Sequence, residues 1–173
     1  MSSETGLAAS RLPFTLRQLC IAVAVLSAAG VGSALAIEHI GGIPPCPLCL
    51  DQRIAYYAAI PAAALAALIA RRNPLLSRLL LAAVALGFLV NTGLGIYHAG
   101  IEWGFWPGPD ACSGMAPLAT SPEALLQSLN NPHVVRCDAA AVRILGISLA
   151  GYSALLSALL AVMGGLGMKA RAA

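Results

Sequence analysis

The sequence predicts an all-α integral membrane protein, a four-transmembrane-helix bundle with two periplasmic loops, the second carrying a short surface helix. Composition gives the class: 59% of the 173 residues are hydrophobic, only 10% are charged, and the mean hydropathy is +0.82. That is too little charge to cover a soluble globular surface. Four apolar runs give the number of spans, and the distribution of Lys and Arg gives their orientation.

Each apolar run approaches the length of about 20 residues that a helix needs to cross the hydrocarbon core. The first run is longer than the roughly 7 to 15 apolar residues of a signal peptide, so we expect an uncleaved span. No internal repeat or linker is visible, and we expect one membrane domain over residues 1–173. The predicted spans are residues 19–37, 54–70, 79–97 and 144–163.

Most of the ten basic residues lie before the first span, between the second and third, or after the fourth. The excess of Lys and Arg in cytoplasmic loops then places both chain termini in the cytoplasm. Segments 38–53 and 100–143, with four of the five cysteines, face the periplasm of a bacterium, where disulfides persist. The net charge of +3 forms no basic patch with interleaved aromatic residues, so we expect no nucleic-acid partner.

Two further patterns concern local structure. In the second loop, Ser121, Pro122 and Glu123 have the order of a helix start, and the leucines that follow would lie on a membrane surface. In the third span, Asn91 and Thr92 are expected to hydrogen-bond a neighbouring helix.

The motif Cys46-Pro47-Leu48-Cys49 stands where the second span begins. Proline suits the first helical position, which places Cys46 near the N-cap and Cys49 near the third position. Sulfurs there lie beside unpaired N–H groups and the positive end of the helix dipole, which favours thiolate over thiol. Arg53, four residues beyond Cys49, adds a positive charge on the same helical face. The motif therefore predicts redox chemistry at the outer membrane–water boundary.

The other cysteines leave alternatives open. Zinc usually takes four ligands, and no second close-spaced cysteine pair is present, so zinc at the motif is a minor alternative, as is a permanent disulfide. A bridge between Cys112 and Cys137 is expected in an oxidising compartment, either as a loop staple or as a second redox pair that exchanges with the first. Cys20 lies in the first span and is expected to be buried and inert.

Together these residues resemble the disulfide bond formation protein B (DsbB) family. The resemblance rests on the cysteine motif followed by Gln52-Arg53, on the segment 97–103, on the distal pair and on the four spans, and it covers essentially the whole chain. It implies a protein-disulfide oxidoreductase of the inner membrane. Such an enzyme reoxidises a periplasmic thioredoxin-fold dithiol oxidase (DsbA-like) and passes the electrons to a membrane quinone, ubiquinone or menaquinone.

The resemblance also implies a path for the electrons. The partner attacks Cys112 of the distal bridge and leaves oxidised, and Cys137 then attacks Cys46. This frees Cys49 as the thiolate that reduces the quinone.

The same resemblance implies that Arg53 stabilises the negative charge developing on the quinone and the sulfur, and that His98 lies near the quinone ring. No metal ion is expected. One rival resembles the vitamin K epoxide reductase family and runs in the opposite direction, and another is a non-catalytic membrane scaffold with structural disulfides. Two features favour the resemblance to the DsbB family over the first of these rivals. They are Gln52-Arg53 after the motif and the position of the distal pair between spans three and four.

Overall fold

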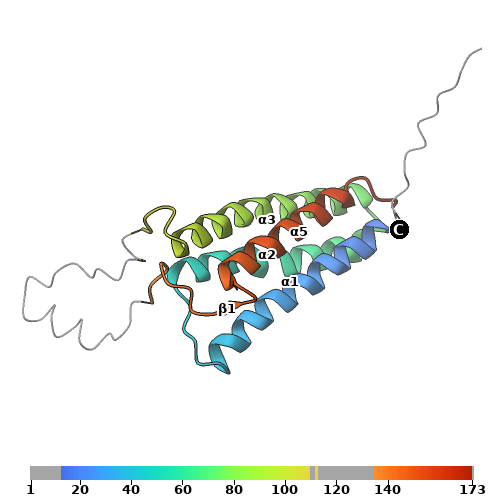
Figure 1. The fold of residues 1–173 in the computed structure, drawn as a ribbon. Coiled ribbons are helices and arrows are strands. Elements are labelled where there is room, and N and C mark those ends of the chain that lie inside the picture. Colours follow the sequence, from blue (N-terminus) through green and yellow to red (C-terminus); the bar gives the residue numbers. More distant parts are fainter. Residues whose placement is uncertain (1–12, 110–111, 113–134, 173) are drawn as a thin grey trace, which may run out of the picture.

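A computed structural model describes residues 13–109, 112 and 135–172, and these residues contain four long helices (Figure 1). All four are long and apolar enough to cross a membrane, which confirms the predicted four-helix membrane bundle. The predicted surface helix after Ser121 lies outside the described residues. The helices are α1 (Leu16–His39), α2 (Pro47–Ile69), α3 (Pro74–Glu102) and α5 (Leu149–Gly167), and the short strands are β1 (Arg143–Ile144) and β2 (Ile147–Ser148).

Side-chain caps fix where each helix begins. In each case the cap side chain accepts a hydrogen bond from a backbone N–H of the first turn, which would otherwise have no partner. Proline occupies the first helical position of α2 and of α3. The capping residues are Thr15, Cys46, Asn73 and Ser148.

The start of the fourth span differs from the prediction. We expected helix from residue 144, but residues 143–148 form an antiparallel hairpin in which Arg143 pairs with Ser148, and α5 begins only at Leu149. Leu145 and Gly146 make the turn with φ angles of 52° and 83°, values that no α-helix contains. An apolar run alone does not separate such a hairpin from the first turn of a helix.

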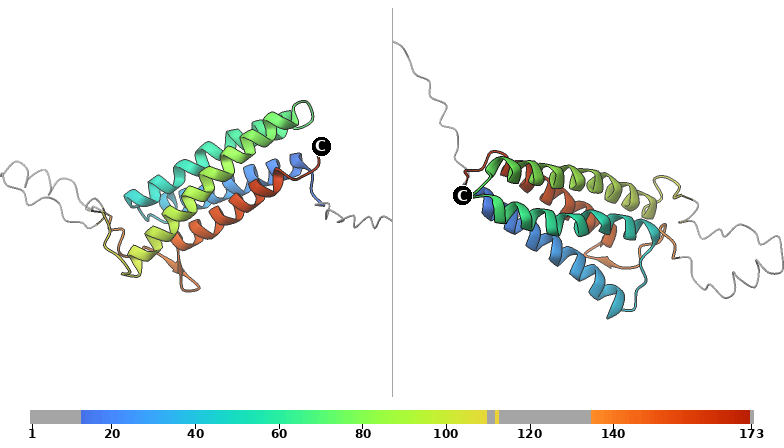
Figure 2. Two further views of the ribbon diagram at one scale, coloured as in Figure 1. Left: turned by 90° about the horizontal axis from the view of Figure 1, so that it is seen from above. Right: turned by 180° about the vertical axis from the view of Figure 1, so that it is seen from behind.

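The four helices form a closed bundle in which α3 packs on α2 and α5, and α1 packs on α2 and α5 (Figure 2). The start of α1 and the chain after α5 lie at one end, where the Leu16 N–H donates to the Arg171 carbonyl over 2.9 Å. The opposite end holds the starts of α2 and α5 and the last turn of α3. We call it the cysteine end, because Cys46, Cys49, Cys112 and Cys137 all lie there.

Small residues allow the helices to approach closely. Gly95 of α3 lies against Ala154 of α5, and a Cβ added at Gly95 would sit 2.9 Å from the Ala154 Cβ and 3.0 Å from its Cα. Close backbone contact of this kind holds membrane helices together where no hydrophobic force acts between them. The larger buried side chains, Phe88, Leu16, Leu81 and Leu160, belong to one hydrophobic core cluster between the helices.

A buried polar cluster joins three helices. Asn91 of α3 donates to Ser157 Oγ of α5 over 2.9 Å, and Tyr56 of α2 shares a 3.0 Å hydrogen bond with the same oxygen. The prediction for Asn91 is therefore confirmed. It is wrong for Thr92, whose hydroxyl donates to the Phe88 carbonyl of its own helix over 2.7 Å, because a threonine side chain easily reaches the carbonyl one turn back.

Candidate active site

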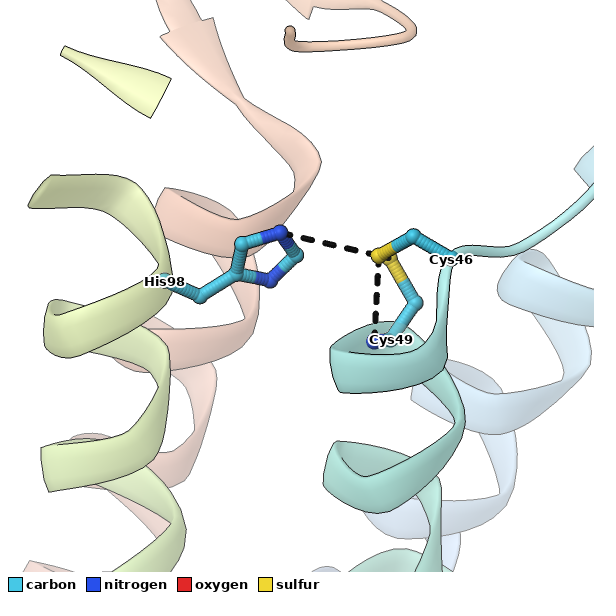
Figure 3. Close-up of side chains that lie close together, drawn as sticks. All are labelled: Cys46, Cys49 and His98. Carbon is cyan, nitrogen blue, oxygen red and sulfur yellow. Dashed lines mark hydrogen bonds between the residues drawn. The ribbon is translucent and has the colours of Figure 1, made fainter. Parts of the chain in front are cut away.

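The first cysteine pair lies at the N-terminus of α2, with Cys46 as N-cap and Cys49 at the third helical position, as predicted. The Cys49 N–H donates to Cys46 Sγ over 3.3 Å, and the two sulfurs are 2.6 Å apart without a bridge (Figure 3). Cys46 is buried and Cys49 is half-buried. The two sulfurs are thus close enough to be joined by a disulfide after a small movement.

The neighbouring sulfur makes the Cys46 thiol a weaker acid. Contact with the Cys49 sulfur, together with burial, raises the pKa of the Cys46 thiol. Two sulfurs at 2.6 Å cannot both carry a negative charge in a poorly solvated site. The prediction of a thiolate at both positions is therefore wrong for Cys46, because it considered the helix N-terminus and not the neighbouring sulfur.

His98 extends from the last turns of α3 toward the sulfurs and is only 1% exposed (Figure 3). Its Nε2 lies 3.6 Å from Cys46 Sγ. On the other side of the ring, Gln52 Nε2 of α2 donates to Nδ1 over 2.9 Å. Because Nδ1 is the acceptor there, Nε2 carries the hydrogen of the neutral ring and directs it toward the cysteine pair.

Two polar groups at this site had no role assigned from the sequence. Gln52 is 3% exposed and fixes the tautomer of His98. The Glu102 side chain is 6% exposed, and its Oε1 lies 3.9 Å from His98 Nε2. Gln52 Oε1 and Glu102 Oε2 are buried without a hydrogen-bond partner among the described residues. The available signal for Gln52 was its position beside Arg53, three residues after Cys49 of the cysteine motif.

Arg53 lies on the same side of α2 as Cys49, and its side chain is 12% exposed. It forms an ion pair with Glu38 near the end of α1. The sequence placed Arg53 correctly relative to the cysteine motif but gave no indication of Glu38. The guanidinium is therefore held in place by α1, and its charge is paired within the site.

A cavity of about 190 Å³ lies between α1, α2, α3 and α5 and reaches the cysteine pair. Its apolar walls include Ile37, Ile43 and Leu156, whereas Cys49 and Arg53 lie among its polar lining. His98, Gln52, Glu102 and Tyr56 line it as well. Apolar walls with a few convergent polar groups are typical of a small-molecule site.

The second cysteine pair is bridged. Cys112 and Cys137 form a disulfide, and both are 1% exposed. They belong to one buried cluster with Cys46, Leu48 and Ile101, so the bridge packs beside the first pair. Sequence spacing alone did not determine this proximity, because it depends on how the segment after α3 returns to the bundle.

Two charged residues flank Cys137, and the fifth cysteine lies away from the site. Arg136 and Asp138, which flank Cys137, bind each other through two hydrogen bonds, and the guanidinium lowers the pKa of the Asp138 carboxyl. The two charges beside Cys137 thus pair with each other. Cys20 is buried in α1 and lies 3.8 Å from Ser77 Oγ, apart from the other cysteines.

Comparison with known proteins identifies the family of the chain. The family model described as "Disulfide bond formation protein DsbB" matches residues 16–167, which is nearly all of the chain. The chain belongs to the DsbB family. Two relatives named disulfide bond formation protein B, from Ralstonia nicotianae and Cupriavidus metallidurans, are each 32% identical. The matches cover 84% of this chain and 89% of the relative in the first case, and 79% and 83% in the second.

An uncharacterized protein of Rickettsia prowazekii is 30% identical over 150 residues, which cover 86% of this chain and 85% of that protein. No solved structure gave a significant match. Membership of the DsbB family makes this chain a multi-pass membrane protein of disulfide bond formation, with a disulfide oxidoreductase role. The two adjacent cysteine pairs are the groups in the described residues that offer this chemistry.

Proposed function

We propose that the chain is a quinone-dependent thiol oxidase that reoxidises a periplasmic thioredoxin-fold dithiol oxidase and passes the electrons to a membrane quinone. One observation carries this proposal. The Cys112–Cys137 bridge shares a buried cluster with Cys46, while Cys49 lines a cavity between the membrane-spanning helices. Such a site can receive electrons from a soluble protein on one side and deliver them to a lipid-dissolved acceptor on the other.

The proposed orientation places the cysteine end in the periplasm and both termini in the cytoplasm. Among the described residues, six basic side chains belong to segments at the opposite end of the bundle, and the positive-inside rule favours the cytoplasm for that end. They are Arg17, Arg71, Arg72, Arg78, Lys169 and Arg171. The disulfide at Cys112 and Cys137 is consistent with an oxidising compartment at the cysteine end.

Each step of the proposed cycle exchanges one disulfide for one dithiol. A thiolate of the partner attacks Cys112 and displaces Cys137, and the second thiol of the partner resolves this mixed disulfide, which leaves the partner oxidised. Cys137 then attacks Cys46 of the inner disulfide and displaces Cys49 as a thiolate. Closure of Cys112 on Cys137 releases Cys46 as a thiol, which is the protonated form that its raised pKa favours.

The cavity suits a quinone head group, which has a flat apolar ring and two carbonyl acceptors. Apolar walls would hold the ring, and the donors available for the carbonyl oxygens are the Arg53 guanidinium and the His98 Nε2–H. When bound, a quinone supplies an acceptor for two electrons and two protons. The side chains would bind and orient it: Arg53 favours negative charge near Cys49, and His98 holds a proton beside Cys46.

Two variants test this division of roles. In Cys49→Ser, quinone reduction should be abolished, because the donor thiolate is gone. In Cys112→Ser, the inner pair should still react with quinone, but the partner should no longer be turned over. Quinone reduction and partner oxidation are followed separately with purified components. Normal quinone reduction by Cys49→Ser would contradict the proposed role of that sulfur.

A further inference from the structure

We propose that the reduced Cys46–Cys49 pair and His98 form a binding site for one thiophilic divalent cation of the Zn²⁺ class. The sequence alone makes zinc a minor alternative, because it contains no second close-spaced cysteine pair. The structure adds a ligand that spacing could not show, since His98 comes from another helix, 52 residues from Cys46. The three candidate ligand atoms all lie within 4.8 Å of one another.

The distances fit one ion after a small movement. Cys46 Sγ and His98 Nε2 are 3.6 Å apart. Tetrahedral zinc with bonds of about 2.3 Å to sulfur and 2.0 Å to nitrogen places such a pair about 3.5 Å apart. The sulfurs, at 2.6 Å, are closer than the roughly 3.8 Å of two thiolates on one zinc ion. Cys49 must therefore turn away from Cys46, and as a half-buried residue that lines the cavity it has space to do so.

Glu102 provides a group for the fourth position. Its Oε1 lies 3.9 Å from His98 Nε2, and its Oε2 has no hydrogen-bond partner among the described residues. The side chain is 94% buried, at a relative exposure of 6%, and it lines the same cavity as the three ligands. A buried carboxylate oxygen without a partner is costly, and a ligand bond to zinc or a hydrogen bond from a zinc-bound water would satisfy it.

Gln52 can support this site by orienting His98. A metal-bound Nε2 must offer its lone pair, so the ring hydrogen moves to Nδ1 and needs an acceptor. Gln52 faces Nδ1, and its own Oε1 lacks a partner in the described part of the chain. A turn of the amide brings that oxygen to Nδ1–H, which makes Gln52 a positioning residue for the bound form.

Binding moves no electrons. The ion displaces the thiol protons that the pair still carries, the one on Cys46 included, and releases them to solvent as two metal–sulfur bonds form. Oxidation of the pair removes both thiolates, so the site exists only in the reduced state. Where the proposed function holds, the same ion would be a reversible inhibitor, because neither bound sulfur is free to reduce an acceptor.

The experiment uses Cd²⁺ as probe, since its bonds to thiolate give a charge-transfer absorption. The full chain carries Cys112→Ser and Cys137→Ser, so that only the inner pair and buried Cys20 remain, and it is purified in detergent and reduced with a phosphine. We expect one Cd²⁺ per chain with the thiolate band. His98→Ala and Gln52→Leu should each weaken binding by about 10- to 100-fold. The matched control His39→Ala, which changes an exposed histidine at the same end of the bundle, should bind as before.

The same preparation with the inner pair oxidised keeps the sequence and the fold and should not bind. The proposal is overturned if the reduced chain binds no Cd²⁺, if His98→Ala binds as tightly as its parent, or if the oxidised chain binds equally well. Cd²⁺ binding is measured without quinone, and quinone reduction without metal. Loss of quinone reduction alongside intact Cd²⁺ binding would therefore count against the proposed function and not against this site.

Discussion

Replacing Gln52 by leucine tests whether the orientation of His98 matters for catalysis. Leucine has a similar size, but it cannot donate to His98 Nδ1, which Gln52 now does over 2.9 Å. The ring is 1% exposed, so bulk solvent does not readily supply another donor at Nδ1. The imidazole is then free to move its hydrogen to Nδ1, and the hydrogen that faces Cys46 is lost in that tautomer.

The expected loss of turnover in Gln52→Leu follows from the burial of His98 Nδ1, the acceptor that loses its hydrogen bond. A buried group left without its hydrogen bond costs about 1–3 kcal/mol. If that cost falls on the reactive arrangement, turnover with quinone decreases by roughly 5- to 150-fold, since 1.36 kcal/mol corresponds to a factor of ten. The KM for quinone should change much less, because the walls of the cavity remain.

The assay is steady-state quinone reduction by the purified chain, with kcat and KM determined separately. Asn91→Leu is the matched control, because it removes another buried hydrogen bond to a neighbouring helix, to Ser157, away from the sulfurs. It should lower thermal stability while kcat per folded molecule stays within about twofold. Equal losses of kcat in Gln52→Leu and Asn91→Leu would refute the positioning role and leave only a structural one.

Two further predictions concern charge and packing. Arg53→Ala should raise the KM for quinone and lower turnover, because it removes the cation beside Cys49. Glu38→Gln keeps the cation and should lose less activity. A larger loss in Glu38→Gln than in Arg53→Ala would contradict the charge-stabilising role of Arg53. Gly95→Ala should destabilise the bundle by about 1–3 kcal/mol in thermal denaturation, because the added Cβ meets the α5 backbone. Gly93→Ala should not, because a Cβ there has nothing within 4 Å. Equal stability of the two variants would refute this account of the α3–α5 contact.

The parts of the structure that sequence could predict depend on neighbouring residues in the chain. Apolar runs give the four helices, and Pro47 beside Cys46 gives the start of α2 and the position of both motif sulfurs. Arg53 follows from helical spacing. The hairpin before α5 could not be separated from a helix, since its apolar residues suit both structures.

The parts that could not be predicted depend on how the helices are rotated toward one another. Contacts of His98 with Gln52 and of Arg53 with Glu38 each join two helices, and their partners are set by packing across the bundle. The burial of Cys46, which adds to the rise of its pKa, likewise depends on residues of other segments, such as Ile101 and the Cys112–Cys137 bridge. The sequence therefore predicts the reactive residues of the motif, whereas it does not predict which residue of another helix each polar group contacts.

The most direct test of the proposed function is the stoichiometry of a single turnover without oxygen. The chain is reduced at Cys46 and Cys49 and mixed with excess quinone, and quinone loss and free thiols are measured together. We predict one quinone reduced for each pair oxidised, with the loss of two thiols per chain and no reaction in Cys49→Ser. Unchanged quinone, or thiols that remain free while quinone is present, would contradict the proposal that this pair delivers electrons to a membrane quinone.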